Sequence, residues 1–168
     1  MKRNTLILTV GCVILAVCIL GFSHSKKIDY WKTIGITNNG LYTVLKESKG
    51  NPDSVEICED GGAYVIYDGI RFYYPNKDLT GSFLRAEIYT DKYVFGKHGI
   101  TIGTPKDIII SSYKHTKEIS GLPDGELAYE CNGNTIVWFE FDGSNLVKKI
   151  ALTLELYMVS NTKIKVIE

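Results

Sequence analysis

Hydrophobic and polar positions divide this chain into one uninterrupted apolar run near its start and a long alternating region after it. The run covers residues 6–22, contains no charged residue and no proline, and follows Lys2 and Arg3. A helix of this length spans roughly 26 Å at about 1.5 Å per residue, which is within the range of a membrane span. The basic residues ahead of it predict an uncleaved anchor with a cytoplasmic N-terminus. The residues expected in lipid are Leu6, Ile7, Leu8, Val13, Ile14, Leu15, Ile19, Leu20 and Phe22.

Two other interpretations of the apolar run stay open. A secretory signal is removed behind its apolar region, and Ser23 and Ser25 are small residues that suit such a cut. A lipoprotein signal is suggested by Val10-Gly11-Cys12, but a further apolar stretch follows Cys12, where a mature lipoprotein would become polar. All three interpretations place the chain from about residue 26 outside the cytoplasm, either tethered to the membrane by a single pass or secreted after cleavage.

A short basic segment separates the apolar run from the alternating region. We expect residues 1–25 to form the anchor and residues 26–33 to form a juxtamembrane stalk. Tyr30 and Trp31 suit the membrane surface, because aromatic side chains favour the level of the lipid headgroups. The alternative is that Trp31 packs on the folded domain.

The alternating region shows one pattern twice, and we assign the two copies to residues 34–97 and 98–168. The first copy begins Ile34-Gly35-Ile36-Thr37 and the second begins His98-Gly99-Ile100-Thr101. Internal similarity of this kind indicates that each copy is one structural unit.

Each copy is expected to begin with a helix. In the first copy, apolar residues recur at helical spacing over residues 41–48, and Gly50 is suited to ending the helix. In the second copy, Thr104 is a good N-cap and Pro105 fits the first helical position. The β-branched run over residues 108–110 disfavours helix locally, so this helix needs tertiary packing.

Alternation with a period of two predicts strands in both copies, joined by turns rich in Gly, Asn and Asp. The predicted fold class is therefore α+β: an N-terminal membrane helix, then two helix-plus-antiparallel-meander repeats that form one helix-on-sheet layer. The predicted strands are residues 54–59, 63–67, 70–74 and 83–90 in the first copy, and 126–131, 135–141 and 146–157 in the second.

Several short motifs carry a resemblance to a known fold. They are Gly35-Ile36-Thr37, Leu41 to Leu45, Gly50-Asn51-Pro52, Gly99-Ile100-Thr101 and Ile108-Ile109. The pattern resembles the tandem β-lactamase-inhibitor-protein fold, and it is similar to the small outer-membrane assembly lipoproteins. The second copy departs from it by lacking Gly-x-Pro after its helix. The resemblance implies a module that binds a protein partner with a sheet face, without implying that a β-lactamase is the partner.

Helices on one side of the predicted sheet leave its other side open. Alternation directs Ile70, Phe72 and Tyr74 to the core and their neighbours outward, and it also directs Thr153 outward. Trp, Tyr and Arg are enriched at binding hot spots. The alternative is a solvated face on which aromatic cross-strand pairs only stabilise the sheet. The predicted partner-binding residues are Arg71, Tyr73, Arg85, Glu87, Tyr89, Trp138, Glu140, Glu155 and Tyr157.

Other chemistry has little support in the sequence. Cys58 and Cys131 could form a disulfide outside the cytoplasm, but they lack the spacing of zinc ligands. His98 and His115 are not part of a nucleophile signature. The formal net charge is zero and lysine and arginine form no long run, so nucleic acid is a poor candidate partner. We expect no metal, no cofactor and no enzyme.

The expected function is that of a membrane-anchored extracytoplasmic module that binds an envelope protein through its open sheet face. One alternative is a structural protein whose sheet pairs with a second copy of itself in a homo-oligomer. The least supported alternative is a hydrolase of envelope material.

Overall fold

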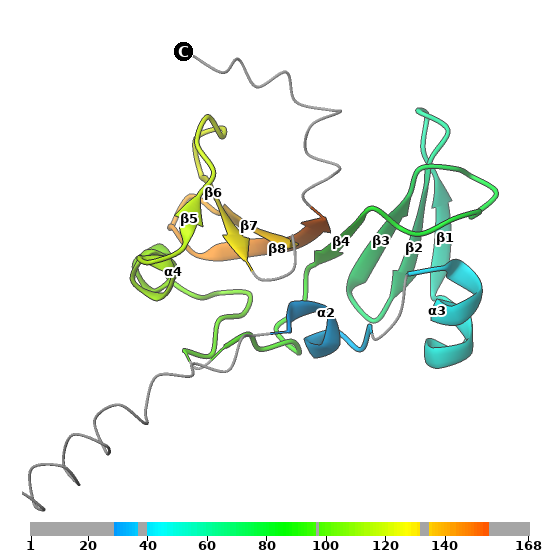
Figure 1. Cartoon of the computed structure of the whole chain (residues 1–168), viewed down its shortest axis with the longest axis horizontal. Helices are drawn as coiled ribbons and strands as arrows, with labels where there is room; N and C mark the ends of the chain where they lie inside the picture. Colours follow the sequence, from blue (N-terminus) through cyan, green and yellow to red (C-terminus); the bar gives the residue numbers. More distant parts are fainter. Residues whose placement is uncertain (1–28, 37–39, 97, 132–134, 155–168) are drawn as a thin grey trace, which may run out of the picture.

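One antiparallel sheet dominates the computed structural model, which describes residues 29–36, 40–96, 98–131 and 135–154 (Figure 1). Its eight strands lie in the order β1-β2-β3-β4-β8-β7-β6-β5. The strands are β1 (Ser54–Ile57), β2 (Ala63–Tyr67), β3 (Ile70–Tyr74), β4 (Arg85–Ile88), β5 (Lys117–Glu118), β6 (Glu126–Cys131), β7 (Thr135–Phe141) and β8 (Val147–Leu154). The described helices are α2 (Tyr30–Thr33), α3 (Tyr42–Lys49) and α4 (Lys106–Tyr113).

The sheet consists of two meanders that meet edge to edge. Figure 1 shows β1 to β4, which follow α3, beside β5 to β8, which follow α4. The last strands of the two meanders pair with each other, so that Ala86 of β4 lies opposite Leu152 of β8 and Ile88 lies opposite Ile150. This junction brings side chains together that are more than sixty positions apart in the sequence.

Tight turns fix which residues face which side of the sheet. Asp68 and Gly69 join β2 to β3, and both have positive φ angles, 46° and 81°, as a two-residue hairpin turn of type I′ requires. A side chain at Gly69 would also meet Thr90 Cγ2 at 2.8 Å. The turn sets a register in which Val65 pairs with Phe72, and these two residues are fully buried.

The core lies on one face of the sheet, and the helices pack on that face. Phe72, Tyr74 and Phe139 are fully buried. Tyr42 of α3 packs edge-on against Tyr74, with ring centroids 6.1 Å apart. Tyr113 of α4 packs against Phe139 at 5.4 Å. The opposite face of the sheet carries the residues that alternate with this core.

The expected α+β fold with a membrane helix and a helical layer is wrong, because the described residues form mostly sheet. The helices comprise four, eight and eight residues. Loops supply much of the cover of the core face, since Ile36, Phe83, Phe95 and Ile100 are buried outside the helices and strands. No described helix is long and apolar enough to cross a membrane, and the predicted anchor at residues 6–22 lies outside the described residues.

The segment predicted as a stalk contributes to the core. Tyr30 is 4 % exposed, and its hydroxyl lies 2.9 Å from that of Tyr113. Trp31 packs against Phe83 with ring centroids 5.5 Å apart, and its Nε1 donates to Thr135 Oγ1 at 3.0 Å. Trp31 therefore packs on the folded domain, which was the alternative to a position at the membrane surface. The division into copies at residues 34–97 and 98–168 stays a prediction.

The two cysteines that the structure describes are not joined to each other. Cys58 and Cys131 are both free thiols. Cys58 follows the edge strand β1, whereas Cys131 ends β6, six positions along the sheet. At about 4.8 Å between strands this is roughly 29 Å, far beyond the reach of a disulfide.

Candidate functional site

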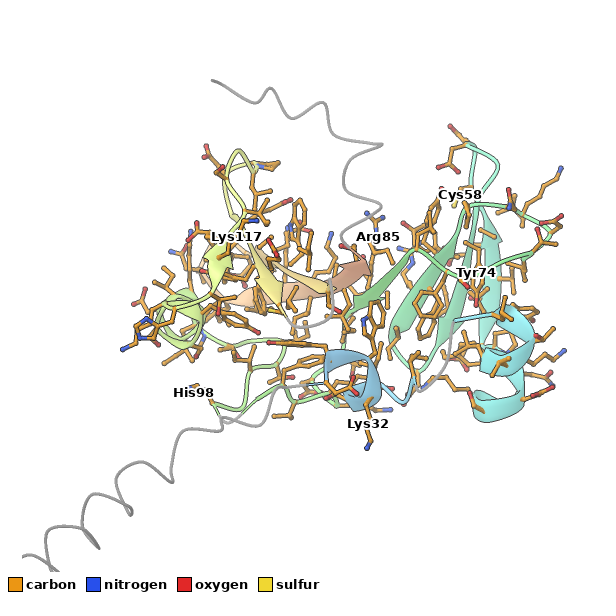
Figure 2. All side chains as sticks on the ribbon, viewed as in Figure 1. Lys32, Cys58, Tyr74, Arg85, His98 and Lys117 are labelled. Carbon is orange, nitrogen blue, oxygen red and sulfur yellow. The ribbon has the colours of Figure 1, made fainter. Side chains whose placement is uncertain are left out.

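The open face is organised in rows that run across the strands. Directly paired residues of an antiparallel sheet share a face. One row crosses β3, β4, β8 and β7 and consists of Arg71, Glu87, Ala151 and Trp138. The next row consists of Tyr73, Arg85, Thr153 and Ile136. Figure 2 shows Arg85 on the side of the sheet away from Lys32 of α2.

A hollow of about 150 Å³ lies on this face over the junction of the two meanders. Its position follows from residue size, because the small Ala151 stands between Glu87 and Trp138 in its row. Two strand spacings, roughly 10 Å, separate those larger side chains, and the methyl group of Ala151 leaves the space between them open. The hollow is lined by Arg85, Glu87, Glu126, Trp138, Lys149, Ala151 and Thr153.

Glu87 is a buried carboxylate held from both sides. It is 5 % exposed, its Oε1 lies 2.9 Å from Arg85 Nη2, and its Oε2 accepts from the Tyr89 hydroxyl at 2.9 Å. Burial, together with the charge of Glu87, raises the pKa of Tyr89 to about 12. Burial favours a lower pKa for Arg85, but Glu87 and Tyr64 outweigh it and the pKa is raised. Both partners of Glu87 therefore keep their protons at neutral pH.

Trp138 and Lys149 are positioned by carboxylates on the second meander. The indole Nε1 of Trp138 donates to Glu126 Oε2 at 2.7 Å. Glu140 pairs with two lysines, with Lys148 Nζ at 2.6 Å and with Lys149. Hydrogen bonds from Lys148 and Lys149 lower the pKa of Glu140 below its usual value of 4.5. These contacts hold the indole and the ammonium group of Lys149, two of the groups that line the hollow.

Two polar atoms of the hollow have no hydrogen-bond partner. They are Arg85 Nε and Thr153 Oγ1, which are both buried. The two residues lie directly opposite each other in β4 and β8. Most buried polar groups in folded proteins have a partner, and a missing one calls for an explanation such as a ligand or a bound water.

Beside the hollow, over β2 and β3, the face is filled by side chains that contact one another. The Arg71 guanidinium lies 4.1 Å from the centroid of the Tyr64 ring and pairs with Glu56 at 2.9 Å. The Tyr64 and Tyr73 rings pack 5.2 Å apart, and Tyr73 donates to Asp60 Oδ2 at 2.8 Å. Burial and Asp60 raise the pKa of Tyr73 to about 12. This region is rich in aromatic side chains, and it also holds a buried polar atom without a hydrogen-bond partner, Arg71 Nε.

The structure places the predicted partner-binding residues in two groups. Arg85, Glu87 and Trp138 line the hollow, although the first two lie on a different meander from the third. Tyr89 and Glu140 contact the lining residues Glu87 and Lys149, and Arg71 and Tyr73 lie opposite Glu87 and Arg85 on the neighbouring strand β3. Glu155 and Tyr157 lie outside the described residues.

Four lining residues were absent from the predicted set, namely Glu126, Lys149, Ala151 and Thr153. Thr153 was expected to face outward, but nothing in the sequence marked it as part of a site. A small residue in an otherwise bulky strand, Ala151, was the one available signal for a depression. Using that signal needs the pairing of β4 with β8, which the sequence does not show.

The lining of the hollow combines charged, aromatic and hydroxyl side chains. It contains two cations, two carboxylates, an indole and a threonine hydroxyl, and no His, Cys or Ser. His98 and His115 are exposed and do not line the hollow. Burial raises the pKa of Cys131, which disfavours the reactive thiolate. Within the described residues, no group of three or more potential ligand side chains is arranged to hold a metal ion.

Comparisons with known proteins give a structural likeness at low sequence identity. No protein-family model and no curated protein matches this chain. An extracellular protein containing a SCP domain from Bacillus anthracis superposes with a TM-score of 0.50 at 11 % identity, covering 70 % of this chain and 44 % of that protein. This likeness shows a shared fold for the matched part.

Two further solved structures match less closely. A cysteine-rich secretory protein from Staphylococcus aureus has a TM-score of 0.45 at 15 % identity, covering 68 % of this chain and 43 % of its own. A DUF4309 family protein from Bacillus subtilis has a TM-score of 0.47 at 12 % identity, covering 71 % of this chain and 81 % of its own. The chain therefore spans less than half the length of the first two proteins. The resemblance to β-lactamase-inhibitor proteins stays a prediction.

Proposed function

We propose that this chain is an extracytoplasmic binding module that captures a protein partner of the cell envelope with the open face of its sheet. The contact is centred on the hollow where β4, β8 and β7 meet. The N-terminal apolar segment tethers the module to the membrane, with its N-terminus in the cytoplasm; secretion after cleavage is the alternative.

The observation that carries this proposal is the convergence of Arg85, Glu87 and Trp138 on one hollow. Trp and Arg are the residue types most enriched among binding hot spots, and such hot spots cluster in desolvated pockets at the centre of an interface. Here the indole and the guanidinium are both held in place by carboxylates, Glu126 and Glu87. A side chain that is already ordered loses less conformational entropy on binding.

The location outside the cytoplasm rests on two supports. One is the apolar run at residues 6–22 behind Lys2 and Arg3. The other is the description of the Bacillus anthracis structure as an extracellular protein. Protease protection of the full chain in intact cells tests it: an intact C-terminal region after protease treatment from outside, with digestion only after lysis, would contradict it.

Affinity capture with the full-length chain in detergent micelles tests the binding proposal. Wild type, Trp138→Ala and Thr43→Val are used as baits on solubilised envelope and secreted proteins of the organism. Thr43 lies exposed on α3, on the other side of the sheet, so Thr43→Val is the matched control. We expect one protein that wild type and the control retain and Trp138→Ala loses, and that rebinds when purified. Equal retention by all three baits, or no retained protein, would overturn the proposal.

Self-association is a second candidate, and the edge strand β1 favours it. All four residues of β1 are exposed, including Val55 at 42 % and Ile57 at 60 %. An exposed apolar edge strand is a template for pairing with another chain. Light scattering would show a mass that rises with concentration in wild type and stays monomeric in Val55→Lys. A monomeric wild type at all concentrations would exclude this candidate.

A further inference from the structure

The hollow at the junction contains polar atoms that no protein group satisfies. Thr153 is 8 % exposed, and its Oγ1 has no partner. Arg85 Nε, on the residue directly opposite, also lacks one. A buried polar group without a hydrogen bond costs free energy. Both atoms are covered in the free chain, and the Arg85 side chain, which is 42 % exposed, would have to shift as a ligand enters. An oxygen atom of the ligand would then accept from Arg85 Nε–H and exchange a hydrogen bond with the Thr153 hydroxyl.

The charges around the hollow select against an ionic ligand. Arg85 and Lys149 supply two positive charges to the lining, and Glu87 and Glu126 supply two negative ones. An anion would approach both carboxylates, and a cation would approach both basic groups, so either gains little Coulomb energy. A wholly apolar ligand would leave Arg85 Nε and Thr153 Oγ1 without partners. A neutral group with several donors and acceptors fits the lining best.

The size and shape of the hollow further restrict which class of ligand fits it. The hollow measures about 150 Å³. A closed apolar cavity of about this volume holds one benzene molecule, so the hollow seats one six-membered ring whose substituents extend outside it. Trp138 lines it beside the methyl group of Ala151, its direct neighbour in β8. Together these two side chains provide an apolar surface next to the polar atoms of Arg85 and Thr153. The ligand therefore combines an apolar flank with polar groups around its rim.

We propose that the hollow binds one neutral sugar ring, an accessible unit of a glycan. Sugar hydroxyls both donate and accept, so one hydroxyl satisfies Arg85 and Thr153 while others reach Glu87 and Lys149. The C–H groups of the ring pack on Trp138. The inference goes beyond the proposed function, because it uses the same face but assigns it a carbohydrate where that function requires a protein surface.

The test is a titration of the full-length chain with neutral sugars. The chain is held in micelles of a detergent without a sugar headgroup, because such a headgroup would compete. Glucose, galactose, mannose and N-acetylglucosamine, each as the monosaccharide and the trisaccharide, are followed by saturation-transfer NMR and tryptophan fluorescence. Ala151→Leu fills the hollow, and Thr153→Val removes its hydroxyl at nearly constant shape. The matched controls are Ser54→Leu, at the exposed edge of the sheet, and Thr43→Val on α3.

We expect saturable binding of at least one of these sugars, weakened tenfold or more by Ala151→Leu and by Thr153→Val and unchanged in both controls. Thr153→Val keeps the test valid if Ala151→Leu fails to fold. No saturation by any sugar, or unchanged affinity in both hollow variants, would overturn the inference. A captured protein without sugar binding would overturn it while leaving the proposed function intact. Sugar binding without a captured protein would support it and count against that function.

Discussion

Two regions of the open face contain similar side chains and differ in how those side chains are arranged. Over β2 and β3, Arg71 lies on the Tyr64 ring, and Tyr64 packs on Tyr73. Over the junction of β4, β8 and β7, Arg85 and Trp138 stand on either side of small residues and line a hollow. Aromatic and arginine side chains therefore do not by themselves mark a site. The small residues Ala151 and Thr153 between them create one.

The carboxylates that pair with arginine in the two regions differ in how deeply they are buried. Glu56, which pairs with Arg71, has a side chain that is 52 % exposed, whereas the side chain of Glu87, which pairs with Arg85, is 6 % exposed. Exposed ion pairs are screened by water and contribute little to stability. A buried carboxylate with two partners is costly to remove, because its partners lose their counter-charge. The junction of the two meanders thus contains both the hollow and the more deeply buried ion pair.

The largest expected difference is in the loss of stability when Glu87 and Glu56 are each replaced. Glu87→Ala should lower the free energy of unfolding by about 2 kcal/mol, because Arg85 and Tyr89 lose a charged hydrogen-bond partner. Glu56→Ala should lower it by no more than about 0.5 kcal/mol, as is usual for an exposed ion pair. Urea unfolding followed by circular dichroism measures both values. Equal losses would remove the energetic distinction between the regions.

The second largest expected difference between the two regions is in their contribution to partner affinity. Trp138→Ala should weaken partner binding at least tenfold, about 1.4 kcal/mol, because it removes a wall of the hollow. Tyr64→Ala, in the filled region, should weaken it less than threefold. Dissociation constants from surface plasmon resonance with the captured partner give both numbers. A larger loss in Tyr64→Ala would move the site to β2 and β3.

Two buried threonines should respond in opposite directions to the same substitution. Thr153→Val should raise the free energy of unfolding by up to about 1 kcal/mol, because it replaces a hydroxyl that has no partner. Thr135→Val should lower it by about 1 kcal/mol, because Thr135 Oγ1 accepts from Trp31 Nε1. Thermal unfolding of the two variants at the same pH measures the pair. A loss of stability in Thr153→Val would show that its hydroxyl is already satisfied.

The smallest effect concerns Glu140 and its two lysines. Its pKa is lower in the folded chain than the usual 4.5, so its stabilising contribution is present above that pH and is lost as the pH falls through the folded value. Glu140→Gln should cost roughly 0.5 kcal/mol at pH 7, and the cost should vanish in acid. Urea midpoints of both proteins between pH 7 and pH 3 show whether the curves converge. A gap of constant size would contradict this assignment.

Local patterns in the sequence predicted local structure well. The strands predicted at residues 63–67, 70–74, 126–131 and 135–141 have those bounds in the structure, because alternation and turn residues are short-range signals. The strand predicted at 83–90 is shorter, with β4 covering Arg85–Ile88. Before it, Phe83 turns into the core and packs on Phe72, and Leu84 is half-buried.

Long-range features were not predictable in the same way. The helix at Tyr30–Thr33 was missed because only long-range contacts, such as those of Tyr30 with Tyr113 and of Trp31 with Phe83, reveal that this segment belongs to the core. The overall class was wrong because loop residues such as Phe95 and Ile100 cover the core face where helices were expected. The hollow depends on the pairing of Glu87 with Ala151 and of Ala151 with Trp138. Neither pairing leaves a trace in the local alternation of the strands.

The measurement that tests the central claim most directly places the same new side chain at two positions of one row. Ala151→Leu fills the hollow, and Ser54→Leu adds a leucine at the edge strand, opposite Ile66. Partner retention by the full-length chain is compared for these variants and wild type, with circular dichroism confirming that each is folded. The account predicts that Ala151→Leu loses the partner and Ser54→Leu retains it as wild type does. Full retention by a folded Ala151→Leu would contradict the assignment of the site to the junction.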